Sequence, residues 1–318
     1  MNYYFAPLEG ITGHLFRETY QEFFGGIDKY FTPFLAPNQD GGLRTREIAD
    51  VQPENNRTVA LVPQILTNHA PAFLKTAQWL ADLGYAEVNL NLGCPSGTVT
   101  AKRKGAGLLG DPALLESFLD EIFSRCPVRI SIKTRVGMQS TEEFPALLAL
   151  FNRYPVSELI VHPRTGAEAY RGHPHGESME FAVQHTDTPL VYNGDLFRTG
   201  DIQAFCDRFP SVDTLMLGRG LLADPGLLRK WEGKPAPDKR TIAAFHDTLL
   251  ERYQTVLSGD RNLLFRCKEL WVYLACLFTN HEKYEKKIRK ATTLDKYRAA
   301  VGALFDEQEL RDDSAFGT

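Results

Sequence analysis

The 318-residue sequence lacks paired cysteines, long apolar runs and a basic, apolar leader, and each absence excludes a class of protein. No apolar run approaches the roughly 18 residues of a membrane span. The N-terminus, MNYYFAPLEG, has neither the basic start nor the apolar stretch of a secretory signal. The five cysteines are scattered and never form a C-x-x-C pair, and they stand at Cys94, Cys126, Cys206, Cys267 and Cys276.

An odd, dispersed set of cysteines argues against a disulfide framework and against a zinc site. It is typical of a protein that works in the reducing cytosol. The histidines show no metal-ligand spacing either. We therefore expect a cytoplasmic protein that holds no metal and has no membrane partner.

The net charge of −4 hides an uneven distribution. Residues 260–300 contain ten Lys or Arg and five Asp or Glu, a local charge of +5, so the rest of the chain carries −9. Such a run is either a solvated helix face or a surface that meets phosphate groups. Charge alone leaves both interpretations open.

Short segments rich in β-branched and aromatic residues alternate with helix-like stretches at intervals of about 25–40 residues. Asn68, Asp111, Asp224 and the pair Ser140 and Glu143 have the pattern of helix starts. This alternation predicts an α/β protein built as a (β/α)8 TIM barrel. A doubly wound sheet is the alternative, but G-x-G-x-x-G is absent after the first strand. The expected strands are 3–8, 29–35, 59–65, 87–93, 128–136, 158–165, 190–196 and 214–220.

Residues 234–240, KPAPDKR, have the composition of a linker. From Thr241 onward only helical patterns appear. We therefore predict a barrel domain at residues 1–233 and a small helical domain at residues 241–318.

Polar residues at the carboxyl ends of the strands should lie together, because active sites in this fold occupy that face. The segments NGD (193–195) and LGRG (217–220) follow the last two strands, after which barrels commonly bind phosphate. A plain tight turn explains LGRG equally well. The strand-end positions hold Pro7, Glu9, Gln64, Asn91, Cys94, Lys133, Arg135, His162, Asn193, Asp195, Gly218 and Arg219.

Cys94 lies in the segment NLNLGCPSGTVTAKRKGAG (89–107), at the end of the fourth expected strand and between Gly93 and Pro95. A thiol there could be a packing residue, a metal ligand, a nucleophile or an acid. With an ordinary pKa of about 8.5 it is mostly protonated at neutral pH, so it can act as a general acid.

Seven segments, spaced in order along nearly the whole chain, resemble the signature segments of the tRNA-dihydrouridine synthases: APLEG, PQI, NLNLGCPSGTV, KTRV, HPRT, YNGD and MLGRG. The resemblance implies an FMN-binding barrel and a helical tRNA-binding domain. It implies reduction of a uridine in the tRNA D-loop to 5,6-dihydrouridine, with NADPH or NADH as the reductant. The short N-terminus and APLEG are most similar to the bacterial C-type synthases, which act at position 16, and we expect a monomer.

The resemblance also implies roles for single residues. Cys94 is the general acid that protonates C5 of the uracil, while hydride passes from flavin N5 to C6. The base is met by Asn91 and Arg135, and Arg266 and Lys268 occupy the R-x-K pattern of the tRNA-binding domain. The implied cofactor-binding residues are Pro7, Gln64, Lys133, His162, Asn193, Asp195, Gly218 and Arg219.

Two segments depart from the family pattern: Pro163 stands where H-G-R-T has glycine, and GHPHGESMEF (172–181) replaces a G-x-A-D-W pattern. Two other functions each explain part of the sequence. An FMN barrel acting on a free pyrimidine, of the dihydroorotate dehydrogenase kind, explains the flavin residues but not the basic helical region. A non-catalytic RNA-binding barrel explains that region but leaves Cys94, Lys133 and His162 without a purpose.

Overall fold

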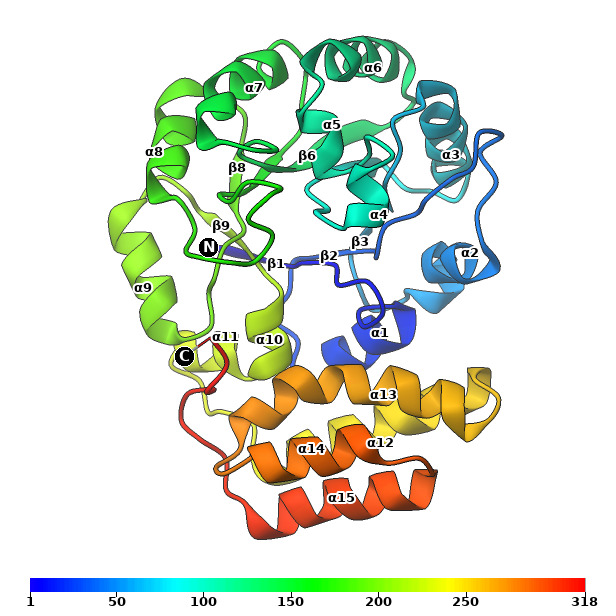
Figure 1. Cartoon of the computed structure of the whole chain (residues 1–318), viewed down its shortest axis with the longest axis vertical. Coiled ribbons are helices and arrows are strands. Elements are labelled where there is room, and N and C mark those ends of the chain that lie inside the picture. The colour runs from blue at the N-terminus through cyan, green and yellow to red at the C-terminus, as the bar shows by residue number, and fades with distance from the viewer. Residues whose placement is uncertain (318) are drawn as a thin grey trace.

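Nine parallel strands form a nearly closed barrel in the computed structural model of the chain, which describes residues 1–317 (Figure 1). Their order around the sheet is β3-β2-β1-β9-β8-β7-β6-β5-β4. The predicted TIM barrel is confirmed. The strands are β1 (Asn2–Phe5), β2 (Lys29–Phe31), β3 (Leu61–Val62), β4 (Gln64–Ile65), β5 (Glu87–Leu92), β6 (Arg129–Arg135), β7 (Leu159–His162), β8 (Leu190–Tyr192) and β9 (Thr214–Leu217).

The barrel closes at Pro63, which divides the expected strand 59–65 into β3 and β4. β3 pairs with β2, and β4 pairs with β5. Proline has no N–H to donate to a ladder, but the Pro63 carbonyl accepts a hydrogen bond of 2.8 Å from the Asn89 N–H. Eight expected segments therefore give nine strands.

Helices surround the barrel and follow its strands (Figure 1). Two short 3-10 helices, η1 (Pro53–Asn55) and η2 (Thr141–Glu143), and four short α-helices lie in the loops. The longer helices are α1 (His14–Phe23), α2 (Thr45–Val51), α3 (Ala70–Asp82), α6 (Pro112–Arg125), α7 (Phe144–Phe151), α8 (Gly176–His185) and α9 (Thr199–Arg208). The short ones are α4 (Gly97–Thr100), α5 (Ala106–Leu109), α10 (Arg219–Ala223) and α11 (Leu227–Trp231).

Two of the predicted helix starts are confirmed. The Asp111 carboxylate accepts a hydrogen bond of 3.2 Å from the Leu114 N–H at the start of α6. Ser140 and Glu143 form a capping box at η2.

Two others are wrong, because a different partner takes the side chain. Asn68 donates to the carbonyls of Lys102 and Arg103, and α3 begins after His69 instead. Asp224 accepts from the Gly226 N–H, and α11 begins only at Leu227.

The amino-terminal end of the barrel is sealed. Lys29 lies 3.1 Å from a Glu87 oxygen and 2.9 Å from a Glu158 oxygen, and the Tyr4 hydroxyl donates to Glu158 at 2.7 Å. Above these ion pairs, a small apolar cluster fills the interior and includes Tyr4, Phe31, Val62, Ile160, Val191 and Met216. A ligand can therefore enter the barrel only from the opposite end, where the strands have their carboxyl ends.

The helical region lies beside the barrel, coloured yellow to red in Figure 1. Phe245 packs among four aromatic rings of α1 and its end, Phe16, Tyr20, Phe23 and Phe24. None of the helices within residues 1–317 combines the length and the apolar composition of a membrane span. The helices are α12 (Lys239–Val256), α13 (Asp260–Leu274), the 3-10 helix η3 (Ala275–Leu277), α14 (Glu282–Lys290) and α15 (Leu294–Glu307).

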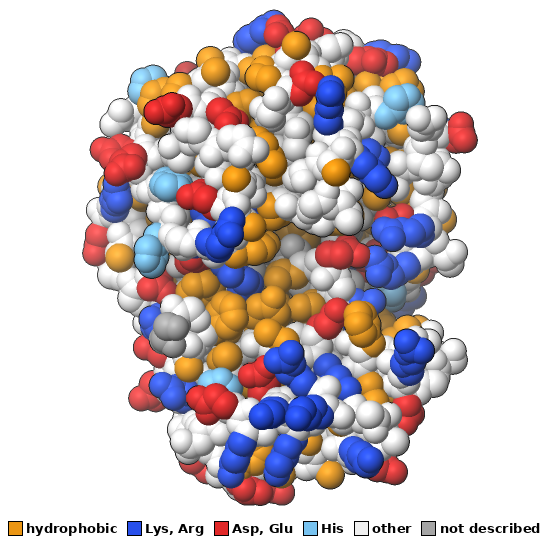
Figure 2. All heavy atoms as spheres, in the orientation of Figure 1, with side chains coloured by type: hydrophobic (Ala, Val, Ile, Leu, Met, Phe, Trp, Pro, Cys, Tyr) orange, Lys and Arg blue, Asp and Glu red, His pale blue; other side chains and the backbone are white. Residues whose placement is uncertain are grey.

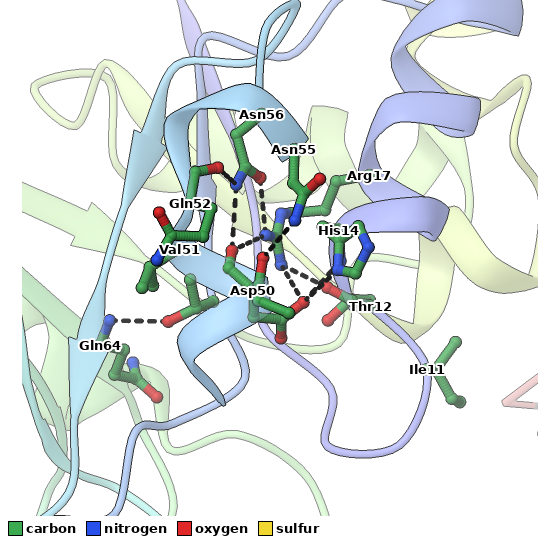
Figure 3. A network of polar contacts seen from close by, with 12 residues as sticks. Ile11, Thr12, His14, Arg17, Asp50, Val51, Gln52, Asn55, Asn56 and Gln64 are labelled. Atoms are coloured by element: carbon green, nitrogen blue, oxygen red, sulfur yellow. Dashed lines mark hydrogen bonds and ion pairs between the residues drawn. The ribbon is translucent and has the colours of Figure 1, made fainter. Parts of the chain in front are cut away.

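A buried ion network fixes the loop between β1 and α1 (Figure 3). Arg17, only 1% exposed, donates to the carbonyls of Thr12 at 2.9 Å and Asp50 at 2.7 Å. His14 donates its backbone N–H to the Asp50 carboxylate at 2.7 Å. Burial raises the pKa of Asp50, but the His14 hydrogen bond and the Arg17 charge outweigh it and hold the pKa below its ordinary value. The loop that this network holds carries Pro7 and Glu9.

We predict that Arg17→Met lowers the free energy of unfolding by about 3–5 kcal/mol, because it removes the buried cation that faces the Asp50 carboxylate and the hydrogen bonds to the carbonyls of Thr12 and Asp50. Urea denaturation at pH 7 measures this. A lowered pKa means that the contribution of Asp50 is present at pH 7 and is lost only on acidification below about pH 4. The control is Arg125→Met, whose 64% exposed side chain pairs with Glu121 and should contribute less than about 0.5 kcal/mol. Equal losses in the two variants would contradict the role of the network.

Candidate active site

A cavity of about 290 Å³ opens at the carboxyl ends of the strands, and a smaller one of about 60 Å³ adjoins it. Pro7, Lys133 and His162 line both. The rest of the predicted set divides between the two: Glu9, Gln64, Asn91, Cys94 and Arg135 line the larger cavity, and Asn193, Asp195, Gly218 and Arg219 line the smaller one. The structure thus brings together every barrel residue that the sequence singles out.

A chain of buried side chains leads across the barrel to Cys94. Asn89 donates to the Ser131 hydroxyl at 2.9 Å and accepts from Gln64 at 2.7 Å. Asn91 donates to Gln64 at 2.6 Å, and its oxygen accepts the N–H groups of Gly93 (3.1 Å) and Cys94 (3.0 Å). The Asn91 amide therefore fixes the turn that presents the thiol.

The Cys94 turn is also held from its other side. The Cys94 carbonyl accepts a hydrogen bond of 3.0 Å from the Ala106 N–H. Gly105 has a φ of 56°, and a Cβ there would lie 2.8 Å from the Cys94 carbonyl oxygen, so only glycine fits. Burial raises the pKa of the Cys94 thiol, and the opposing effects of the Ser96 backbone and Arg135 do not cancel it. The thiol is therefore protonated at neutral pH, as a general acid must be.

Lys133 and Arg135 approach the cavity from β6. Burial and the neighbouring Arg135 charge lower the pKa of Lys133 to about 7. Among the described residues, Lys133 forms no ion pair with a carboxylate. The Arg135 guanidinium donates two hydrogen bonds within the protein, to the carbonyls of Gly93 and Thr165, each at 2.8 Å. An anionic ligand beside Lys133 would restore its charge.

His162 is neutral at physiological pH, because burial and the charges of Arg135 and Lys133 lower its pKa well below the ordinary value. Its Nε2 lies 3.2 Å from Nη1 of the fully buried Arg164. Arginine can only donate, so Nε2 accepts and Nδ1 carries the proton. The imidazole is thus fixed as a neutral donor at the wall of both cavities.

Two arginines share the Asp195 carboxylate: Arg219, which lines the smaller cavity with Asp195, and the fully buried Arg164. Arg164 forms two hydrogen bonds with Asp195, one of them at 3.0 Å, and Arg219 donates to the same carboxylate at 2.6 Å. The charges of Arg164 and Arg219 together outweigh that of Asp195, and Lys133 at the same cavity would gain its full charge beside an anion. The surplus of positive charge suits a phosphate group.

This donor set fits FMN. The turn after β9 approaches closely: a Cβ on Gly218 would lie 3.1 Å from the Ala6 Cβ, and one on Gly220 would lie 2.1 Å from the Leu196 carbonyl oxygen. The contact at Gly220 requires glycine and the one at Gly218 favours it, and Arg219 and Lys133 line the same cavity. The smaller cavity matches a phosphate and the larger one a flat, partly polar ring system.

Arg266 and Lys268 of α13 do not reach the cavity. Arg266 lines a separate small cavity near His14, and Lys268 donates to the Ala291 carbonyl in a groove of the helical region. Sequence reasoning also missed two wall residues of the larger cavity, Tyr170 and Tyr273. Neither ends a strand, so the barrel pattern gave no signal for them.

The two departures from the family pattern meet in one loop. The Pro163 carbonyl accepts a hydrogen bond of 2.6 Å from the His175 N–H, and the His175 ring lies 2.7 Å from the Glu168 carboxylate. Tyr170 lies between these partners along the chain, and its ring stands 4.4 Å from the Arg219 guanidinium. The loop therefore has its own internal support.

Figure 2 shows hydrophobic side chains gathered in the hollow between the barrel and the helical region, with Lys and Arg side chains over the helical region below it. On α14, Lys286, Lys287 and Lys290 are all exposed. A ligand that fills the hollow would therefore meet the basic surface as well.

Comparison with known proteins gives one consistent result. A profile of the dihydrouridine synthase (Dus) family matches residues 4–310. The tRNA-dihydrouridine(16) synthase of Shigella flexneri is 30% identical over 283 residues, which are 85% of this chain and 87% of that protein. The protein of the same name from Salmonella typhimurium is 28% identical and covers 94% of this chain and 98% of its own length.

Two solved structures show the same fold at low identity. A morphinone reductase mutant in complex with tetrahydroNAD has a TM-score of 0.54 at 12% identity, covering 76% of this chain and 89% of its own. An Old Yellow Enzyme from a Pichia species has a TM-score of 0.53 at 10% identity, covering 74% of this chain and 84% of its own.

We predict that alkylation of Cys94 by iodoacetamide has a pH midpoint above the ordinary thiol value of about 8.5. The raised pKa means that the reactive thiolate forms only as the pH rises past that value. Peptide mass mapping follows Cys94 separately from the four other cysteines, with an unstructured cysteine peptide as the control. A midpoint below that of the peptide would contradict the raised pKa, and one below pH 7 would show a thiolate at neutral pH and rule out the acid role.

Proposed function

The chain belongs to the dihydrouridine synthase family, and on that premise we propose that it reduces the C5–C6 double bond of a D-loop uridine in tRNA. Position 16 is the proposed target, supported by the names of its bacterial relatives. The observation that carries the proposal is the protonated Cys94 thiol, fixed at the wall of a cavity whose cations suit FMN.

FMN, reduced by NADPH or NADH, would supply the hydride for C6. We assign its phosphate to the Gly218 turn, with Arg219 beside it, and its ring system to the wall of Pro7, Gln64, Lys133 and His162. Lys133 would hold negative charge there, since it has no carboxylate partner among the described residues. Asn193 keeps the turn in place, because its amide donates to the Met216 carbonyl at 2.7 Å.

Cys94 then completes the reaction by giving its proton to C5 of the uracil. Asn91 and Arg135 are proposed to meet the base, each with a donor left after its contacts within the protein. The wall around the thiol keeps it protonated before the reaction, and Arg135 and Lys133 stabilise the thiolate that remains afterwards. Solvent can return a proton to Cys94 once the product leaves.

The helical domain, residues 241–318, is proposed to dock the tRNA, and the barrel, residues 1–233, to carry the chemistry. Arg266 and Lys268 would contribute to docking away from the cavity. A free pyrimidine would need no such domain, and a non-catalytic RNA-binding barrel would need no cavity with Cys94 and Lys133. We further propose that the protein is a monomer and that it works in the cytoplasm, where its five free cysteines would stay reduced.

The test is a reaction with an unmodified tRNA transcript, FMN and NADPH, followed by nucleoside mass spectrometry. We expect a mass gain of two hydrogens in one D-loop uridine, and digestion to fragments identifies the position. Free uridine and orotate serve as alternative substrates. Turnover of either of them with none of tRNA would overturn the proposal in favour of a free-pyrimidine reductase.

We predict that charge reversal at Lys286, Lys287 and Lys290 weakens tRNA binding and flattens its dependence on salt. Each lysine that meets a phosphate releases counterions, so its loss reduces the slope of log affinity against log salt concentration by about 1. Filter binding at several salt concentrations measures this. The control reverses Arg125 and Arg129, which are 64% and 69% exposed on the barrel. An unchanged slope in the lysine variant would identify α14 as a merely solvated face.

A further inference from the structure

The guanidinium of Arg219 lies among three aromatic rings from three distant segments. Its Cζ is 4.4 Å from the ring centre of Tyr170, 5.3 Å from that of Phe197 and 5.8 Å from that of Phe316. Tyr170 belongs to the loop after β7 and Phe197 to the loop after β8. Phe316 comes from the C-terminal segment, residues 308–317, which follows the helical region.

The C-terminal segment returns from the helical region to the barrel along a defined path (Figure 1, red). Leu310 forms an antiparallel bridge with Phe278, and the Arg311 N–H donates to the Leu277 carbonyl at 2.8 Å. The Ala315 N–H donates to the Cys276 carbonyl at 2.9 Å. These contacts carry the segment up to the loop after β8.

The ring of Phe316 is fixed by two others at its destination. It meets Phe197 edge-on, with ring centres 5.2 Å apart at 75°, and lies 5.2 Å from Tyr273. Gly317 has a φ of 78°, and a Cβ there would lie 2.6 Å from Phe197. The segment is therefore packed tightly against the residue that also contacts Arg219.

We propose that Phe316 is a positioning residue for Arg219, so that the C-terminal segment completes the phosphate site of the cofactor. The assignment rests on the proposed binding of FMN. Asp195 holds one edge of the guanidinium, and the rings hold its plane, which removes the rotamer freedom of a long side chain before the ligand arrives. Arg219 can then face a phosphate without losing further entropy.

We assign Phe316 to the phosphate site and not to the site of the flavin ring system. Phe316 lines neither cavity, so it acts on a ligand through its neighbours, which are Arg219 and Phe197 at the smaller cavity and Tyr273 at the larger one. Of these three, only Arg219 carries a charge that a phosphate can meet. A ligand without a phosphate should therefore be insensitive to Phe316. Riboflavin, which differs from FMN only by the phosphate, is the matched probe.

The experiment measures the affinity of flavin-stripped protein for FMN and for riboflavin by fluorescence quenching, in the wild type, Phe316→Ala and Phe316→Leu. We expect both variants to bind FMN about 3- to 30-fold more weakly, since leucine keeps the apolar volume but offers no ring face. Riboflavin affinity should be unchanged, and Phe316→Tyr should restore FMN binding. Circular dichroism melting confirms that each variant is folded.

A double-mutant cycle with Arg219→Met completes the test. Once the guanidinium is gone, Phe316→Ala should have no further effect on FMN affinity. Wild-type FMN affinity in Phe316→Ala, or an equal loss for riboflavin, would overturn the positioning role. Absence of FMN binding in the wild type would instead overturn the proposed function, so the two failures are distinguishable.

Discussion

The turn that presents Cys94 depends on hydrogen bonds between buried side chains, and the rest of the site is arranged around them. Ser131, Asn89, Gln64 and Asn91 come from three neighbouring strands and link one to the next at 2.6–2.9 Å. A buried amide that loses its partner costs about 1–3 kcal/mol, so each member holds the next in a single orientation. The side-chain oxygen of Asn91 accepts the backbone N–H groups of Gly93 and Cys94, and these two hydrogen bonds position the thiol. The barrel strands supply the rigid frame that makes this possible.

The helical region also contributes to the active site, because it packs against the barrel. Phe245 packs against α1, and the network of Arg17 and Asp50 holds the loop that follows β1. This docking brings α13 to the mouth of the cavity, where Tyr273 forms part of the wall. The basic surface and the reactive thiol are thus parts of one arrangement, in which a bound polynucleotide would reach both.

The sequence predicted the barrel and the strand-end residues because a parallel barrel necessarily gathers its strand ends on one face. It did not predict the links between Asn89, Gln64 and Asn91, since pairing register decides which side chains meet. The predicted cap at Asn68 was wrong because two carbonyls of a distant loop accept hydrogen bonds from its amide. The aromatic surroundings of Arg219 were equally hidden, since Phe197 and Phe316 meet only through the fold.

The central claim is that Cys94 delivers the proton, and it is tested most directly by measuring the two half-reactions of Cys94→Ala separately. Anaerobic stopped-flow absorbance of the flavin follows both, with Cys206→Ala as the control. Reduction by NADPH needs no thiol and should proceed at the wild-type rate. Reoxidation by tRNA should slow about 10²–10⁴-fold, because the general acid is missing. Reoxidation at the wild-type rate would contradict the account and assign Cys94 to packing.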